Sequence, residues 1–333
     1  MAGLSEELKK IAPKLKLEEK YQDQLYSEIA QEDFMQTMKA FAEKQFQLIS
    51  LFCVEKFEGQ QGYCLLYAFE KQVYPEILVL KRRISSKASS IALLFPSACW
   101  YEREIQDGFG ILFEDLFDSR RLFLHEAFPK DFYPLRKNTE NKLPPLLQRI
   151  PLEQEYQFKQ VHGEGVYHIP VGPVHAGIIE PGHFRFSVIG ETIFNLEVRM
   201  FWKHRGIEKL AEGKSLEFGL QLAQAISGDE SVANALAFCE AAEKICKASI
   251  PPKAQHLRVL FAEMERIYSL LGDLAGMIID VAYPAGASQF FILREEMMRL
   301  NERVSDSRFL KNAIVLGGVK KDIPMDMLND LKS

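Results

Sequence analysis

The sequence has no apolar stretch of about 18 uncharged residues, so we expect none of its segments to span a bilayer. Residues 1–20 mix Leu and Ile with Lys and Glu and contain no apolar core of a secretory signal. Five cysteines are dispersed over 333 residues without a C-x-x-C pair, as is typical of reduced thiols. We therefore expect a soluble cytoplasmic protein that reaches the cytoplasmic face of the inner membrane only through partners.

Several sequence motifs of catalysis and cofactor binding are also absent. The chain contains no G-x-G-x-x-G, P-loop, G-x-S-x-G or H-E-x-x-H sequence. Histidine and cysteine are too dispersed for a zinc site. With Lys+Arg 41 against Asp+Glu 46, the net charge of -5 favours no nucleic-acid partner. The function classes that remain are an enzyme and a component of an assembly.

The first half of the chain shows the patterns of an α/β domain. Residues 32–45 carry apolar side chains at helical spacing, and residues 97–109 predict a second helix that ends at glycine. Three strand-like runs lie between them, at residues 46–57, 63–71 and 76–84. A short glycine-containing connection joins the first two runs and predicts a hairpin.

The length suits about two domains of roughly 100–200 residues each. Residues 138–151 contain three prolines and show no periodicity, so we place the boundary there. We expect one domain over residues 1–140, a linker over 141–165 and a second domain over 166–333.

The second half begins with strand patterns and continues with long helices. Strands are predicted at residues 166–171, 184–189 and 193–200, and helices at 231–247 and 254–280. The expected class is α+β: an N-terminal α/β sandwich domain, followed by a small β-sheet and a bundle of long helices.

Three residues of the second half are candidates for chemistry. His175 lies in a Gly/Pro loop between predicted strands, where it is either functional or a turn residue exposed to solvent. Glu208 lies in a charged cluster, residues 204–209, at an expected helix start, where the helix dipole alone could account for it. Asp280 ends an apolar helix and must reach water, a backbone donor or a partner such as His175.

Four short motifs of the first half resemble the signature of one component of NADH dehydrogenase, its C subunit. These C-like motifs occur in the order of that family and imply its fold for residues 1–140. They are Tyr101–Glu104, Asp107–Ile111, Arg120–Leu122 and Pro134–Lys137.

From residue 169 onward the chain looks like the D subunit of complex I, which carries the quinone site, and like the large subunit of membrane-bound nickel-iron hydrogenases. A C-like domain fused ahead of a D-like one is similar to the large subunits of formate hydrogenlyases, and the sequence of two segments (170–177 and 180–184) leans to that branch. The matching pieces are Gly172–His175, His204–Lys209, Arg258–Glu263 and Gly317–Asp322.

The chain departs from the hydrogenases where they carry C-G-I-C. Here Ser227 and Glu230 stand in place of the two cysteines, with Gly228 and Asp229 between them, and Asn234 replaces a nearby histidine. Nickel in this family needs thiolates, which oxygen side chains do not replace. The family also continues beyond the Gly317 region, so we expect a C-terminally truncated form or a shortened subunit.

The resemblance implies a peripheral-arm core subunit of a membrane-associated, ion-translocating oxidoreductase complex, with electron transfer towards quinone or another acceptor. It gives His175 and Asp280 the positions beside the quinone headgroup and Glu208 that of the proton-transfer glutamate. We expect this chain to bind no cofactor alone and to be inactive in isolation. The expected partners are an iron-sulfur small subunit holding the cluster, a membrane proton-channel subunit and quinone. The alternatives are a non-catalytic coupling or assembly subunit, and a nickel hydrogenase with altered ligands.

Overall fold

The computed structural model describes residues 3–21, 23–151, 155–175 and 180–324. These residues form two compact units, one of residues 1–174 and 181–204 and the other of residues 175–180 and 205–333. The three strands that follow the proline-rich segment thus group with the N-terminal unit. The expected boundary at residues 141–165, which separates two family resemblances, stays a prediction.

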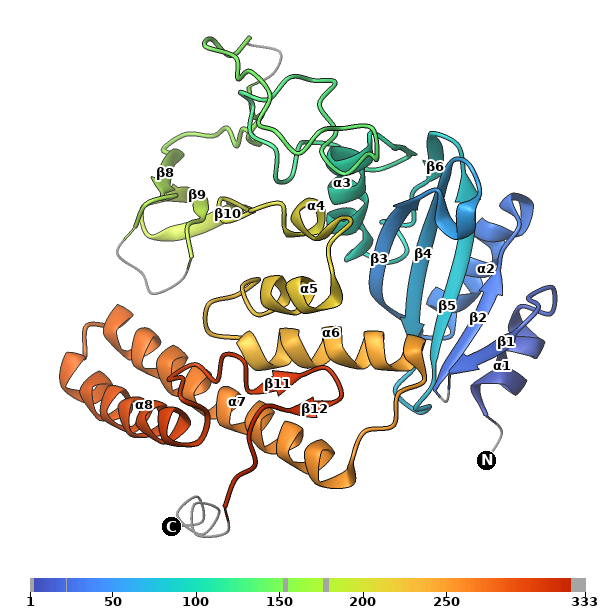
Figure 1. Cartoon of the computed structure of the whole chain (residues 1–333). Coiled ribbons are helices and arrows are strands. Elements are labelled where there is room, and N and C mark those ends of the chain that lie inside the picture. Colours follow the sequence, from blue (N-terminus) through green and yellow to red (C-terminus); the bar gives the residue numbers. More distant parts are fainter. Residues whose placement is uncertain (1–2, 22, 152–154, 176–179, 325–333) are drawn as a thin grey trace. The chain divides into compact units, whose positions relative to one another are not determined.

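The N-terminal unit is built on a five-stranded mixed sheet in the order β1-β2-β5-β4-β3 (Figure 1). The predicted hairpin is confirmed, since β3 and β4 pair antiparallel, whereas β2 pairs parallel with β5. A short parallel pair, β6 with β7, lies beside it. The strands are β1 Glu18–Tyr21, β2 Gln24–Glu28, β3 Gln47–Glu55, β4 Tyr63–Glu70, β5 Ile77–Ile84, β6 Lys87–Ser89 and β7 Leu112–Glu114.

Helices cover one face of this sheet. Phe34 of α2 packs against Tyr67 of β4, and Phe109 of α3 packs against Tyr63 on the same face, because successive odd positions of a strand share a face. These residues belong to one apolar core that includes α1. The helical elements are α1 Leu4–Ile11, α2 Gln31–Glu43, the 3-10 turn η1 Phe57–Gly59 and α3 Ala98–Phe109.

A second, antiparallel sheet of the N-terminal unit has the order β10-β9-β8. Its strands are β8 Tyr167–Val171, β9 His183–Ile189 and β10 Thr192–Arg199, close to the three predicted segments. The β8–β9 connection carries the Gly/Pro loop of His175, and residues 176–177 of that loop lie outside the described residues.

The second unit is helical. Its two long helices, α7 and α8, lie side by side (Figure 1), and α7 starts with proline at a position where the missing N–H costs nothing. A second core joins α5, α6, α7, the C-terminal part of α8 and a small hairpin. The elements are α4 Ile207–Ala211, α5 Leu216–Ala223, α6 Ser231–Cys246, α7 Pro252–Asp280, α8 Pro284–Ser305, β11 Ile314–Val315 and β12 Gly318–Val319. The α+β class is therefore confirmed.

Candidate functional site

Ser227 to Glu230, where the resemblance predicts that oxygen side chains replace two cysteines, lie in the connection between α5 and α6. Asp229 and Glu230 are exposed and Ser227 is half-buried. The Ser227 hydroxyl donates a hydrogen bond of 2.9 Å to an Asp229 carboxylate oxygen. The segment thus presents a hydroxyl and two carboxylates, which accept hydrogen bonds and exchange protons.

Side chains from distant parts of the helical unit hold the backbone of this connection. The buried Tyr268 of α7 donates its hydroxyl to the Asp229 carbonyl at 2.5 Å. Arg205, from the charged cluster at the start of α4, donates to the carbonyls of Ala225 and Ile226 at 2.5 and 2.7 Å. The backbone on both sides of Ser227 is therefore fixed by tertiary contacts, independently of the side chains that the segment presents.

The first turn of α6 receives a carboxylate from α7. Glu265 is 4% exposed and accepts the N–H groups of Val232 and Ala233 at 2.6 and 2.8 Å. Burial raises the pKa of Glu265, and the two N–H groups act in the opposite direction. The carboxylate satisfies N–H groups that have no partner within the helix.

The three residues predicted from the sequence lie at separate places of the helical unit. His175 is half-buried and belongs to the β8–β9 connection, Glu208 is exposed in the first turn of α4, and Asp280 is the exposed last residue of α7. The Asp280 side chain reaches water, and within the described part of the chain it forms no hydrogen bond or ion pair. The structure does not join it to His175, and the functional roles of all three stay predictions.

Two motifs of the second half meet in a buried ion pair. Arg258 of α7 donates to both carboxylate oxygens of Glu243 of α6, at 2.8 and 2.6 Å. The same guanidinium donates to the carbonyls of Val315 and Gly318, and Glu243 also accepts the N–H of Gly317. Arg258 therefore anchors the β11–β12 hairpin, which contains the first residues of the Gly317–Asp322 motif.

The C-like motifs come together around α3. One carboxylate oxygen of Asp107 accepts the N–H groups of Leu122, Phe123 and Leu124, at 2.8, 3.0 and 3.1 Å. Arg103 donates to the carbonyls just before them, those of Arg120 and Arg121. The first three motifs thus fold a single loop against one helix.

The fourth motif closes on the end of the same helix. Arg136 donates to the Phe109 carbonyl at 2.7 Å, and the Leu135 N–H donates to the Gly108 carbonyl at 3.0 Å. A Cβ at Gly108 would lie 2.8 Å from the end of the Leu135 side chain, so a larger residue there would require Leu135 to shift. The motif series of the first half is a scaffold of structural contacts.

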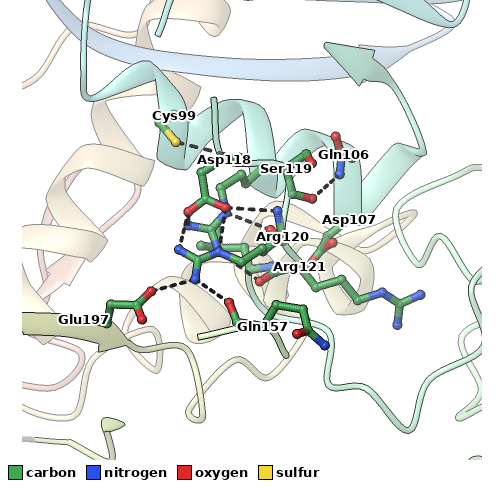
Figure 2. A network of polar contacts seen from close by, with 11 residues as sticks. Cys99, Gln106, Asp107, Asp118, Ser119, Arg120, Arg121, Gln157 and Glu197 are labelled. Carbon is green, nitrogen blue, oxygen red and sulfur yellow. Dashed lines mark hydrogen bonds and ion pairs between the residues drawn. The ribbon is translucent and has the colours of Figure 1, made fainter. Parts of the chain in front are cut away.

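Arg120 connects this loop to the second sheet of the N-terminal unit. Figure 2 shows its guanidinium between Asp118 and Glu197 of β10, with the Gln157 carbonyl as a third acceptor. The ring of Tyr156 lies 4.9 Å from the guanidinium carbon. The loop, the segment around residue 157 and β10 are thereby held to one another.

A buried carboxylate in this unit should make stability depend on pH. Glu102 of α3 is 0% exposed and accepts hydrogen bonds from the Ser90 hydroxyl and the Ile91 N–H, at 2.6 and 2.8 Å. Burial raises the pKa of Glu102 from 4.5 to about 7, against the effect of these hydrogen bonds and of the Arg82 charge.

We expect Glu102→Gln to become more stable than wild type as the pH rises. The folded-state pKa lies above the unfolded one, so ionisation destabilises the fold: the penalty is absent below pH 4.5 and complete above about pH 7. The difference in unfolding free energy should grow by about 3 kcal/mol at most over this window. Urea unfolding of both proteins at a series of pH values measures it, and a pH-independent difference would contradict the assignment.

Nickel does not fit the residues at the site. The connection offers a hydroxyl and carboxylates where nickel needs thiolates, and burial raises the pKa of Cys239, on the neighbouring helix, to about 11. Within the described ranges, no group of three His, Cys, Asp or Glu side chains is arranged to hold a metal ion.

Sequence reasoning assigned no role at the site to Glu265 or Tyr268, although the helical spacing contained a signal. Leu257 and Phe261 belong to the buried stripe of α7, which continues through Met264 to Tyr268 and includes Glu265 beside them. A carboxylate on the core side of a helix requires a donor, which is the physical reason to single it out.

Known proteins similar to this chain are subunits of NADH dehydrogenase and of hydrogenase complexes. Residues 27–144 match the family described as respiratory-chain NADH dehydrogenase, 30 Kd subunit. Over 270 residues the chain is 32% identical to Hydrogenase-4 component G of Escherichia coli (strain K12), covering 78% of this chain and 48% of that protein. Over 242 residues it is 32% identical to Formate hydrogenlyase subunit 5 of the same organism, covering 71% and 42%.

A third relative carries both halves of the resemblance in its name. Over 292 residues the chain is 27% identical to the NADH-quinone oxidoreductase C/D subunit of Phocaeicola vulgatus, covering 82% of this chain and 56% of that protein. The chain is therefore a homologue of NADH-quinone oxidoreductase C/D subunits and of the hydrogenase-4 and formate hydrogenlyase components, with a 30 Kd-subunit domain at residues 27–144. The family recognised from the motifs is confirmed. The chain spans about half the length of the curated relatives it matches.

Proposed function

We propose that the chain is a core subunit of the peripheral arm of a membrane-associated, ion-translocating oxidoreductase complex. One observation carries this proposal: the α5–α6 connection has a backbone fixed by tertiary contacts and presents hydroxyl and carboxylate oxygens. Its relatives include proteins whose names specify quinone reduction or hydrogen metabolism. Since oxygen side chains do not suit nickel, the proposal is electron transfer towards quinone or another acceptor.

In this proposal His175, Glu208 and Asp280 act on protons. Quinone reduction consumes two electrons and two protons, so the site needs groups that hold and release protons. Glu208 and Asp280 are exposed carboxylates, and His175 belongs to a Gly/Pro loop. The pairing of His175 with Asp280 expected from the sequence would require these residues to approach one another when a ligand binds.

The proposed partners follow from what this chain lacks. In the part of the chain that the structure describes, no helix combines the length and apolar character needed to cross a bilayer. We assign the iron-sulfur cluster to a small subunit, and ion movement to a membrane subunit at the cytoplasmic face. The NAD-linked chemistry that the family name implies would also belong to partners.

The first test is metal analysis with spectroscopy on the native complex, purified with this chain as bait. Iron and sulfide without nickel, together with binding of a short-chain quinone (decylubiquinone), are the expected results. Stoichiometric nickel would contradict the proposal and identify the complex as a nickel hydrogenase. A complex that binds no quinone would leave a non-catalytic coupling role. In the same assay, His175→Ala and Asp280→Asn should each weaken quinone affinity about tenfold, the effect of roughly one lost hydrogen bond to a charged group.

A further inference from the structure

We infer that Glu265 is a positioning residue for the α5–α6 connection, and that it leaves Glu230, beside the exposed Asp229 that accepts the Ser227 hydroxyl, available to face a ligand. The inference rests on the proposed function and deepens it. Glu265 touches no proposed substrate, so its effect would pass through the backbone that it fixes.

The start of α6 is capped by a side chain from another helix. A Ser, Thr, Asp or Asn before the first turn can accept N–H groups of that turn with its own side chain, as Ser215 does at the start of α5. In α6 the residue at that position is Glu230, and its side chain makes no capping hydrogen bond. The cap comes instead from Glu265, on another helix, through two N–H groups at 2.6 and 2.8 Å.

Because Glu265 caps α6, the side chain of Glu230 is not needed for capping. A carboxylate engaged in capping would be turned towards its own helix, whereas Glu230 is exposed. Its carbonyl accepts the Asn234 side-chain amide at 2.8 Å, so its backbone is held while its carboxylate is free to interact. The buried Glu265 caps α6, and the side chains of Asp229 and Glu230 are both exposed.

Two residues of α7, one turn apart, bracket Glu230. Tyr268 holds the carbonyl before it, at Asp229, and Glu265 holds the N–H groups after it, at Val232 and Ala233. The Ser231 hydroxyl adds a third fixed point by donating to the Phe309 carbonyl. Because each contact comes from outside the segment, the backbone geometry is set before any ligand arrives.

A cap that served only stability would not need this arrangement. Burying a carboxylate carries a desolvation penalty, which the raised pKa of Glu265 reflects, whereas a serine or aspartate at the helix start caps without burial. Burial does bring precision, since a packed side chain on a long helix holds its acceptor more rigidly than a surface side chain can.

The test is Glu265→Gln in the native complex, with Glu263→Gln as the matched control. The amide keeps the size of the carboxylate but can accept only through its oxygen, so it cannot receive both N–H groups equally well. Glu263 lies on the same helix and is exposed, and it pairs with Arg266. The control therefore makes the same chemical change away from α6.

We expect Glu265→Gln to accelerate amide exchange at Val232 and Ala233 about tenfold and to weaken decylubiquinone affinity or lower kcat about fivefold or more, the effect of about one hydrogen bond. Glu263→Gln should change neither. Faster amide exchange, with quinone affinity and kcat within twofold of wild type, would show that Glu265 contributes only to stability. That result would overturn this inference and leave the proposed function intact. A wild-type complex that binds no quinone would leave the non-catalytic coupling role instead of the proposed one, and would overturn the role of Glu265 in positioning a quinone site with it.

Discussion

Replacing Arg258 with methionine should lower the free energy of unfolding of the helical unit by about 3–5 kcal/mol, because it leaves a buried carboxylate without its counter-ion. Glu243 is 7% exposed and would keep only the N–H of Gly317. The carbonyls of Val315 and Gly318 would lose their donor as well. The β11–β12 hairpin should then detach from α6 and α7 before the rest of the unit unfolds.

Arg266→Met is the control for this prediction. Arg266 lies on the same helix and pairs with Glu263 at the surface, where a pair contributes about 0–1 kcal/mol. Thermal unfolding should show a fall of roughly 2–4 °C per kcal/mol for Arg258→Met and almost no change for Arg266→Met. Equal shifts in the two variants would show that the buried pair does not hold the hairpin.

Asp107→Ala should destabilise the N-terminal unit by an amount of the same order. The variant removes the acceptor shared by the N–H groups of Leu122, Phe123 and Leu124, in a place where water cannot replace it. A buried donor left without a partner costs about 1–3 kcal/mol, so the combined loss should be about 3–5 kcal/mol. Hydrogen exchange should rise most at these three amides.

Asp107→Asn separates charge from hydrogen bonding at this position. The asparagine keeps one carbonyl oxygen that can accept these N–H groups, so the loss should be clearly smaller than for alanine. Burial raises the pKa of Asp107 despite the three hydrogen bonds, which means that its charge carries a desolvation cost in the fold. Denaturant unfolding of both variants measures the difference, and a loss as large for asparagine as for alanine would place the contribution in the charge.

The site combines features that the sequence predicted with others that it could not predict. Ser227, Asp229 and Glu230 were singled out from the sequence, because the flanking motifs predict that Ser227 and Glu230 stand where the hydrogenases carry cysteines, and that replacement stays a prediction. The sequence also contains Glu265, but its partners are the N–H groups of a different helix. Such a contact depends on how α6 and α7 pack, and local spacing carries no information on that.

Elements with a strong local period were predicted most closely. The helix expected at residues 231–247 is α6, Ser231–Cys246, and the one expected at 254–280 is α7, Pro252–Asp280. The helix α8, Pro284–Ser305, was not predicted, although it is 22 residues long. Its side chains Phe291, Ile292 and Leu293 are exposed in succession, so no single apolar stripe marks it in the sequence.

The sequence by itself determined the family, the α+β class, the principal strands and helices of both halves, and the oxygen chemistry of the α5–α6 connection. These properties follow from local periodicity and from the order of motifs along the chain. Only the tertiary structure decided that the C-like motifs fold one loop around α3, that Arg258 anchors the β11–β12 hairpin, and that Glu265 caps α6. Each of these contacts joins residues distant in sequence, and a buried polar group obtains its partner only when the packed elements bring one within hydrogen-bonding distance.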